Sequence, residues 1–276
     1  MKFEIIKIKK MKRIILIALL FWNADFCFSQ DSNESKYKTA KRTQLSKNKG
    51  DAVVEIARSF LEKPYVAFTL EEKGAERLIV NLSQFDCSTL VEQCIAIANS
   101  LDYNSFKNEL TKLRYRNGKL DGYGSRLHYL TDWLVVNQAN QVLSLETKKI
   151  GGEVFKKQVN FMTTHWDKYP RANSDEIKNE ITESEKSIAK SKLYYIPKNK
   201  IDSLQYLIKN GDIIAITTSI AGLDCSHQGF AVFVNSKLHL LHASSSKKKV
   251  IISEETLSNY LKKNKLQTGI MVARLF

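Results

Sequence analysis

The sequence predicts an α+β fold in which helices precede an antiparallel sheet. Apolar residues recur at helical spacing in three segments between residues 51 and 118. From residue 211 onward, short runs rich in Ile, Val, Leu and Phe are separated by turn residues, a pattern typical of strands. Helical and strand segments are therefore grouped rather than alternating, and this order favours α+β over a parallel α/β sheet.

Residues 1–30 have the composition of a secretory signal peptide. Lysines and Arg13 precede an apolar run from Ile14 to Trp22, which is about half the ~20 apolar residues that a membrane-spanning helix needs. We expect this segment to be removed on export, leaving a periplasmic or cell-envelope protein with no integral membrane association. The polar, lysine-rich residues 31–50 are predicted to form a flexible leader.

The remaining 226 residues, 51–276, are long enough for a single domain, and their elements follow in order. Asp51 is expected to cap a helix that ends before Pro64. The expected elements up to residue 118 are the helix from 51, a strand over 76–82, a helix over 87–101 and a helix over 106–118. Residues 120–200 have mixed patterns and are predicted to be an inserted helical and loop segment, with a loop and helix over the charged stretch 174–192.

The last third of the chain supplies the predicted sheet. Residues Asn235 to Lys237 separate two apolar runs and predict a hairpin. The expected strands are 211–218, 227–234, 237–244, 249–253 and 269–276.

The chain is basic. Its formal net charge is +14, and residues 1–30 carry six Lys or Arg and two acidic residues, so residues 31–276 keep +10. The basic residues are dispersed, with no zinc finger or aromatic RNA-binding motif beside them, which argues against nucleic acid as a partner. Solubility explains much of this charge, and an anionic cell-wall ligand would also suit it.

Three cysteines remain after the predicted signal peptide: Cys87, Cys94 and Cys225. An odd number leaves at least one free thiol in an exported protein. Cys87 and Cys94 are two helical turns apart, about 10 Å, which is too far for a disulfide. No CxxC pair is present in the sequence, which disfavours a zinc site built on thiolates.

Cys87 stands at the start of a predicted helix, within the stretch FDCSTLVEQ. A helix N-terminus favours thiolate over thiol, and its free N–H groups face the position where an oxyanion would form. Most lone cysteines are structural, and Cys94 fits that role because it lies on the apolar face. Cys87 fits it less well, because Asp86 and Ser88 flank it, so we expect a nucleophile with a lowered pKa.

A cysteine nucleophile requires a histidine base that a third polar group orients. The five histidines are His128, His165, His227, His239 and His242. His227 opens a predicted strand, and alternation puts His239 and His242 on opposite faces of the next strand. A simple two-residue turn would place His242 opposite Ala231, some way from His227. The pattern alone therefore leaves the orienting group open.

The motifs FDCSTLVE, HQGFAVF and LLHASS, in that order, resemble those of the NlpC-type papain-like cell-wall hydrolases. The resemblance implies a papain-like fold, with the nucleophile at a helix N-terminus packed on an antiparallel sheet that carries the catalytic histidine. It also implies that Cys87 is the nucleophile, His227 the base and His242 the orienting residue, with Gly229 matching the glycine after the base. It implies no metal and no cofactor.

Five motifs between residues 64 and 245 narrow the resemblance to the N-acetylmuramoyl-L-alanine amidase-like branch of that superfamily. They are PYVAFTLE, ERLIVNLSQFDCSTLVE, LRYRNG, YGSRLHYLTDW and LHASS. The branch implies hydrolysis of the amide between N-acetylmuramic acid and L-alanine, with 1,6-anhydro muropeptides as substrates. We expect a monomer. The alternatives are a γ-D-glutamyl-diamino acid endopeptidase of the same fold and a catalytically silent wall-binding protein.

The same resemblance and the local patterns suggest substrate contacts. Arg126 can bind a carboxylate with two hydrogen bonds, and His128 and Tyr129 lie beside it, although aromatic residues at this spacing often only pack. The other expected contacts are Tyr65 and Ser88, both near the nucleophile. Cys225 occupies a position where a small aliphatic residue is expected, and its role is open.

Overall fold

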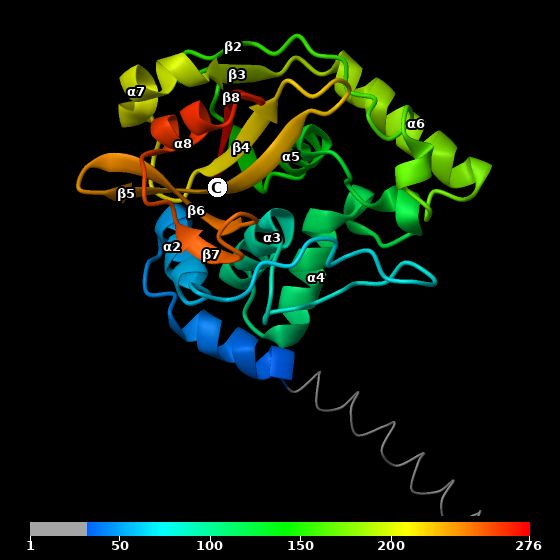
Figure 1. Ribbon diagram of the computed structural model, residues 1–276. Coiled ribbons are helices and arrows are strands. Elements are labelled where there is room, and N and C mark those ends of the chain that lie inside the picture. Colours follow the sequence, from blue (N-terminus) through cyan, green and yellow to red (C-terminus); the bar gives the residue numbers. More distant parts are fainter. Residues whose placement is uncertain (1–31) are drawn as a thin grey trace, which may run out of the picture.

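The computed structural model describes residues 32–276 (Figure 1). Its centre is an antiparallel sheet with the strand order β2-β3-β8-β4-β5-β6-β7, and β1 also pairs with β8. The strands are β1 (Leu143–Leu145), β2 (Glu153–Val154), β3 (Tyr194–Pro197), β4 (Ile213–Thr218), β5 (Cys225–Val234), β6 (Lys237–Ser244), β7 (Lys249–Ile252) and β8 (Gln267–Leu275). Helices and an antiparallel sheet together confirm the predicted α+β class.

Helices cover both faces of the sheet. In Figure 1, α2, α3 and α4 gather on one side, and α7 and α8 lie on the other. The helices are α2 (Lys49–Arg58), α3 (Cys87–Asn99), α4 (Tyr103–Arg114), α5 (Leu130–Ala139), α6 (Asp175–Lys190), α7 (Ile201–Leu204) and α8 (Leu257–Lys263), with a further helix over residues 32–42. None of these helices is long and apolar enough to cross a membrane.

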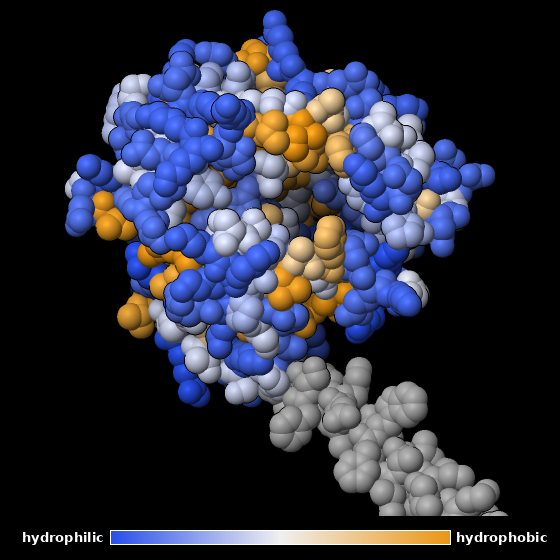
Figure 2. Space-filling model, in the orientation of Figure 1, coloured by the Kyte–Doolittle hydropathy of each residue, from blue (hydrophilic) through white to orange (hydrophobic). Residues whose placement is uncertain are grey.

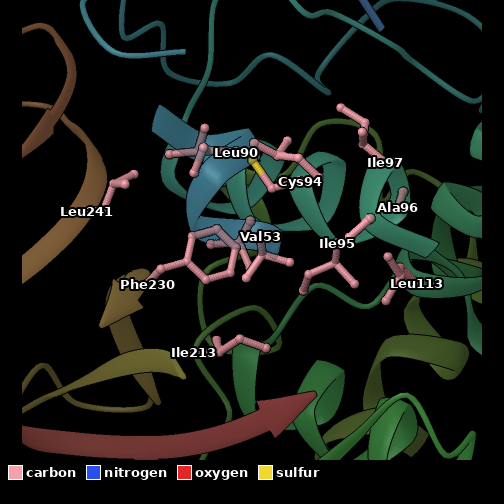
Figure 3. Packing of buried hydrophobic residues seen from close by; sticks show 14 of the residues in the cluster. Val53, Leu90, Cys94, Ile95, Ala96, Ile97, Leu113, Ile213, Phe230 and Leu241 are labelled. Atoms are coloured by element: carbon pink, nitrogen blue, oxygen red, sulfur yellow. The ribbon is translucent and has the colours of Figure 1, made fainter. Parts of the chain in front are cut away.

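Successive side chains of β4 point to opposite faces of the sheet, and this explains why helices pack on both faces. Ile213 and Ala215 pack in the cluster that holds α2 and α3, whereas Ile214 and Ile216 pack in the cluster that holds α8. Figure 3 shows the first cluster, where Ile213 lies near residues of α2, α3 and β5. Each buried side chain of this size contributes about 1.5–3 kcal/mol, so both faces of the sheet are held by apolar burial.

The helix α3 is the buried centre of the molecule and begins with a capping box. Oδ1 of Asp86 accepts from the backbone N–H of Thr89 at 2.8 Å, and Oγ1 of Thr89 accepts from the N–H of Asp86 at 3.0 Å. Ten of its thirteen residues are buried. The box fixes where the helix starts, and it therefore fixes Cys87 as the first helical residue.

The N-terminal part of the described chain differs from the expected flexible leader. Residues 32–42 form a helix in which Tyr37 and Ala40 are buried. The hydroxyl of Tyr37 hydrogen-bonds Ser100 at 3.0 Å, and its ring packs on Phe106 in α4. Two apolar residues three apart suffice to dock a short lysine-rich helix. The predicted signal peptide, residues 1–30, lies outside the described residues.

Two further predictions need correction. Asn48, not Asp51, caps α2, so Asp51 lies in the first turn. Residues 76–82 form no strand, because their carbonyls bond side chains instead: that of Ile79 accepts from Arg114, and that of Val80 accepts from Asn33.

Residues 120–200 contribute to the main sheet as well as to its periphery. The strands β1 and β3, both within this segment, pair with β8. The charged stretch 174–192 is almost wholly the helix α6, whose Ile181 and Ile188 pack in a third apolar cluster. Most of its charged residues face solvent, although Glu185 is buried. The helix that the sequence predicted here is therefore confirmed and takes up nearly the whole stretch.

Candidate active site

Cys87 and His227 line the same cavity, which has a volume of about 180 Å³ and also contacts Ser88 and His128. A second cavity of about 330 Å³ shares Ser88 and His128 with it and extends toward Phe68. Figure 2 shows this face hollowed between the regions of α3 and α5, with apolar side chains on its rims. The start of α3 and the start of β5 therefore meet in one cleft.

The thiol of Cys87 is half-buried, and the backbone N–H of Gln228 donates a hydrogen bond to it. Burial, with the nearby charge of Asp86, raises the pKa of Cys87 to about 11. The helix start therefore does not lower this pKa as the sequence predicted, because loss of solvent outweighs the helix dipole. A pKa in this range favours the neutral thiol at rest.

The two histidines of the site meet through the β5–β6 hairpin. Nε2 of His227 lies 2.6 Å from Nδ1 of His242, and the two rings are nearly perpendicular. Asn235 and Ser236 form the turn with positive φ angles of 50° and 62°, which suits a two-residue hairpin turn. The structure thus brings together the three residues predicted as nucleophile, base and orienting group.

The register of the hairpin differs from the one expected. Ala231 pairs with Leu240, not with His242. Pairing runs as far as Phe230 and Leu241, and the next step along the strands brings His242 beside Gly229. Because positions 227 and 229 share one face of β5, His227 and His242 are diagonal neighbours across the two strands.

Gly229 makes room for this pair. A Cβ at position 229 would lie 2.6 Å from the carbonyl oxygen of Leu241 and 2.9 Å from Cβ of His242. Position 229 must therefore be glycine, because any side chain there would collide with the neighbouring strand β6.

Replacing Gly229 with alanine should lower kcat/KM by about 10- to 100-fold, because displacement of His242 misaligns His227. The overpacking should also cost about 1–3 kcal/mol of unfolding free energy, measured in urea. Gly74→Ala is the matched control: Gly74 has φ +94 but open space around it, so this variant should lose some stability and keep its activity. Equal activity of Gly229→Ala and wild type would contradict the steric role.

Burial sets the charge state of both histidines. It lowers the pKa of His227 to about 4, against the opposing charge of Asp86. Burial and the neighbouring His227 lower the pKa of His242 to about 3. At neutral pH both rings are uncharged, so His227 is free to accept a proton from Cys87.

The raised pKa of Cys87 predicts slow alkylation at neutral pH. The rate with iodoacetamide should climb about tenfold per pH unit between about pH 7 and 10, in step with the thiolate fraction. Cys94 and Cys225 are buried, with raised pKa values, and should add little; the Cys87→Ala variant measures their background. A rate that levels off below about pH 8 would instead show a thiolate–imidazolium pair at rest.

Tyr65 and Ser88 lie beside the nucleophile. The pKa of Tyr65 is raised by burial and by the facing Cys87, which places its ring near the thiol. Ser88 accepts a hydrogen bond from the side chain of Gln228 at 3.0 Å. Both residues are positioned at the cleft, and their contacts with substrate stay predictions.

Arg126 lies in the wall of the larger cavity and is 6% exposed. Its guanidinium donates to both carboxylate oxygens of Glu76, at 2.9 and 2.7 Å, to Glu71 at 2.5 Å and to the carbonyl of Leu70 at 3.1 Å. This residue therefore holds the loop over residues 70–76 in place. Its role as a carboxylate ligand for substrate stays a prediction.

His128 and Tyr129 also line the larger cavity. A ring nitrogen of His128, Nε2, lies 2.9 Å from the carbonyl oxygen of Tyr123, and burial lowers the pKa of His128 to about 3. The hydroxyl of Tyr129 donates to Glu185 in α6 at 2.7 Å. Their substrate contacts stay predictions as well.

Sequence reasoning missed three residues at this site. Gln228 bonds both Cys87 and Ser88. Its position between His227 and Gly229, inside the motif that carries the expected base, could have identified it as a site residue. Asp224 is buried and accepts from the N–H and hydroxyl of Thr131 at 2.7 and 2.8 Å, which ties the start of α5 to β5. The ring of Tyr260 packs against His242, and nothing in the sequence pointed to it.

Cys225 is buried at the start of β5 and lines the smaller cavity with Cys87. All three cysteines of residues 32–276 are free. Within the same residues, no three His, Cys, Asp or Glu side chains come together as a metal site.

A family of known proteins and several solved structures match this chain. The family model described as N-acetylmuramoyl-L-alanine amidase-like matches residues 55–270. A crystal structure of an N-acetylmuramoyl-L-alanine amidase from Bacteroides uniformis is 40% identical and covers 83% of this chain and 99% of its own, with a TM-score of 0.79. No curated protein matches the chain.

Two further solved structures are similar. One, named a putative xylanase from Bacteroides fragilis, is 40% identical and covers 79% of this chain and 98% of its own, with a TM-score of 0.75. A Legionella pneumophila protein is 23% identical, covers 91% of this chain and 96% of its own, has a TM-score of 0.71, and shows the fold alone. Since the family model spans most of the chain, this protein belongs to the N-acetylmuramoyl-L-alanine amidase-like family.

Proposed function

We propose that this protein is an exported cysteine amidase with a papain-like fold that hydrolyses the bond between N-acetylmuramic acid and L-alanine. Its proposed substrates are peptidoglycan fragments, in particular 1,6-anhydro muropeptides. Family membership supports the bond, and the meeting of Cys87 and His227 in one cleft, with His242 bonded to His227 behind it, supports the mechanism. That convergence, from elements 140 residues apart, is the observation that carries the proposal.

The first half-reaction forms a thioester. Nε2 of His227 is engaged by His242, so Nδ1 is the nitrogen that takes the proton of the Cys87 thiol as sulfur attacks the lactyl carbonyl carbon. Because the thiol's pKa is high and the histidine's is low, proton transfer accompanies the attack and no stable ion pair precedes it. The first-turn N–H groups of Cys87 and Ser88, which have no helical partner, stabilise the oxyanion, with Tyr65 beside them.

The same proton then leaves with the product. Imidazolium His227 protonates the amine of L-alanine as the C–N bond breaks, which leaves the muramoyl group on Cys87. His227 next removes a proton from water, whose oxygen attacks the thioester carbon, and returns it to sulfur. The carboxylic acid is released, and both residues regain their starting state.

The charges around His227 support an orientation for the substrate. His227 also lines a cavity of about 460 Å³ that contacts Glu255, Lys263 and Lys265. Lys263 pairs with Glu255 at 2.9 Å, so Lys265 is the cation that this cavity offers to a ligand. Stem peptides carry carboxylates, which suits this basic side. The sugar would then occupy the cleft toward Phe68 and Tyr123, where aromatic rings line the wall.

A digest of a defined substrate tests the proposed bond and nucleophile together. Wild-type protein without residues 1–30, and the same chain with Cys87→Ala, are incubated with a disaccharide-anhydro-tetrapeptide, and the products are weighed. Free tetrapeptide from the wild type alone is the expected result. Shorter fragments would identify the γ-D-glutamyl endopeptidase, and binding without cleavage would identify a silent wall-binding protein. The reducing-end muropeptide, run in parallel, measures the preference for the anhydro sugar.

A further inference from the structure

His242 has one buried nitrogen whose bonding the mechanism leaves unexplained. The residue is 0% exposed, and its Nδ1 is engaged with His227. Its Nε2 is also buried, and among residues 32–276 it has no hydrogen-bond partner. A buried polar atom without a partner costs free energy, so this nitrogen requires an account.

Counting protons shows that Nε2 of His242 is a donor when His227 acts as the base. A neutral His227 whose Nδ1 is free to take a proton carries its hydrogen on Nε2. That hydrogen is donated to Nδ1 of His242, so the hydrogen of neutral His242 must be on Nε2.

The opposite arrangement is inactive. If His242 carried its hydrogen on Nδ1, it would donate to Nε2 of His227, and the hydrogen of His227 would move to Nδ1. The base would then present an N–H to Cys87 and have no lone pair for the thiol proton. The pair therefore has one competent and one incompetent tautomer, and something must select between them.

The ring of Tyr260 packs edge-to-face with that of His242. It projects from α8, and its centroid lies 5.3 Å from that of His242, with an angle of 79° between the ring planes. The face of an aromatic ring is its electron-rich side, so it attracts an N–H and repels a nitrogen lone pair. Tyr260 is half-buried, as expected for a residue packed between α8 and the sheet.

We propose that Tyr260 is a positioning residue whose ring accepts the Nε2–H of His242 and thereby holds His227 in the tautomer that can deprotonate Cys87. The effect on catalysis rests on the proposed cysteine mechanism. The position of the hydrogen on each histidine does not, because it can be measured without substrate. The ring also acts during the reaction: as His227 becomes an imidazolium, positive charge spreads through the hydrogen bond to His242, and an aromatic face stabilises a nearby cation.

Three variants separate the ring's electronic role from its bulk. Tyr260→Phe keeps the ring and should keep kcat within about twofold. Tyr260→Leu removes it and should lower kcat by about fivefold with little change in KM, as expected for loss of one weak N–H···ring interaction. Pentafluorophenylalanine at position 260 keeps the shape but reverses the charge distribution of the ring, and should behave like leucine. Tyr206→Leu, at an exposed position, is the control and should match wild type.

The decisive readout is the tautomer, which needs no activity. In protein with ¹⁵N-labelled histidine, long-range ¹H–¹⁵N correlations report which nitrogen of each ring carries hydrogen; a His242→Gln sample assigns the signals of His242. Wild type and Tyr260→Phe should show hydrogen on Nε2 of His242, and Tyr260→Leu a mixture or the reverse. Hydrogen on Nδ1 of His242 in wild type would overturn the inference, as would an unchanged tautomer and kcat in Tyr260→Leu. If Tyr260→Leu fails to fold, the tautomer of His242 in the wild type and in the fluorinated variant still tests the inference.

The amidase proposal is tested separately by the digest. If the digest contradicts it, the tautomer measurement is still valid.

Discussion

Replacing Cys87 with alanine should lower hydrolysis of a muramoyl-peptide by about 10⁴-fold or more, because the attacking atom is lost. The chain should still fold: Cys87 is half-buried, and the Asp86–Thr89 capping box that starts α3 does not involve its side chain. Initial rates on the anhydro substrate, with circular dichroism as a check of folding, measure both expectations.

The other two cysteines are matched controls for this variant. Cys225→Ala removes a thiol from the same cavity and should keep most of the activity. Cys94→Ala removes a fully buried thiol from the core, so it should lower stability and leave kcat nearly unchanged in the folded fraction. Activity in Cys87→Ala that approaches that of either control would refute the thiol mechanism.

Arg126→Met should lower the free energy of unfolding by about 3–5 kcal/mol, the usual cost of breaking a buried ion pair from one side. Glu76 is 2% exposed at its side chain and would lose two charge-assisted hydrogen bonds. Arg171, 2.7 Å from the same carboxylate, would remain as its cationic partner, so the loss should lie at the lower end of that range. Denaturant unfolding of the variant and the wild type measures the difference.

Arg77→Met is the comparison for this prediction, because the ion pair of Arg77 with Glu72 is largely exposed. That variant should lose at most about 1 kcal/mol. A loss of similar size in Arg126→Met would show that the buried pair contributes no more than a surface pair. Kinetics of Arg126→Met well below its unfolding temperature also test the substrate role: a raised KM with an unchanged kcat would support a direct contact.

Local patterns were enough for the elements nearest the chemistry. The sequence FDCST contains its own capping box, because Asp86 and Thr89 bond each other three residues apart, and this fixes the start of α3 without help from the rest of the chain. The hairpin turn at Asn235 and Ser236 is likewise local, since two residues with positive φ close it. Such short-range features are independent of tertiary context, which is why they were predictable.

Features that depend on a distant partner were missed. The helix over residues 32–42 is polar apart from Tyr37 and Ala40, and contacts with distant residues such as Ser100 and Phe106 stabilise it. Residues 76–82 have strand-like composition, but Arg114 and Asn33 take the carbonyls of Ile79 and Val80. Strand propensity describes what a segment prefers in isolation. Here side chains 35 and 47 residues away bond the backbone carbonyls and prevent the segment from pairing as a strand.

The sequence by itself determined the α+β class and the start of α3, and its resemblance to a known family named the residues of the proposed chemistry. Only the tertiary structure decided how those residues are arranged and how far they are buried. Packing buries Cys87 and His227 and so reverses the expected pKa of the thiol, because removal from solvent outweighs a helix dipole. The register of β5 and β6 places His242 in the space that Gly229 leaves, and α8 brings Tyr260 against it. Burial and register are properties of the whole fold, since each depends on elements that no single segment contains.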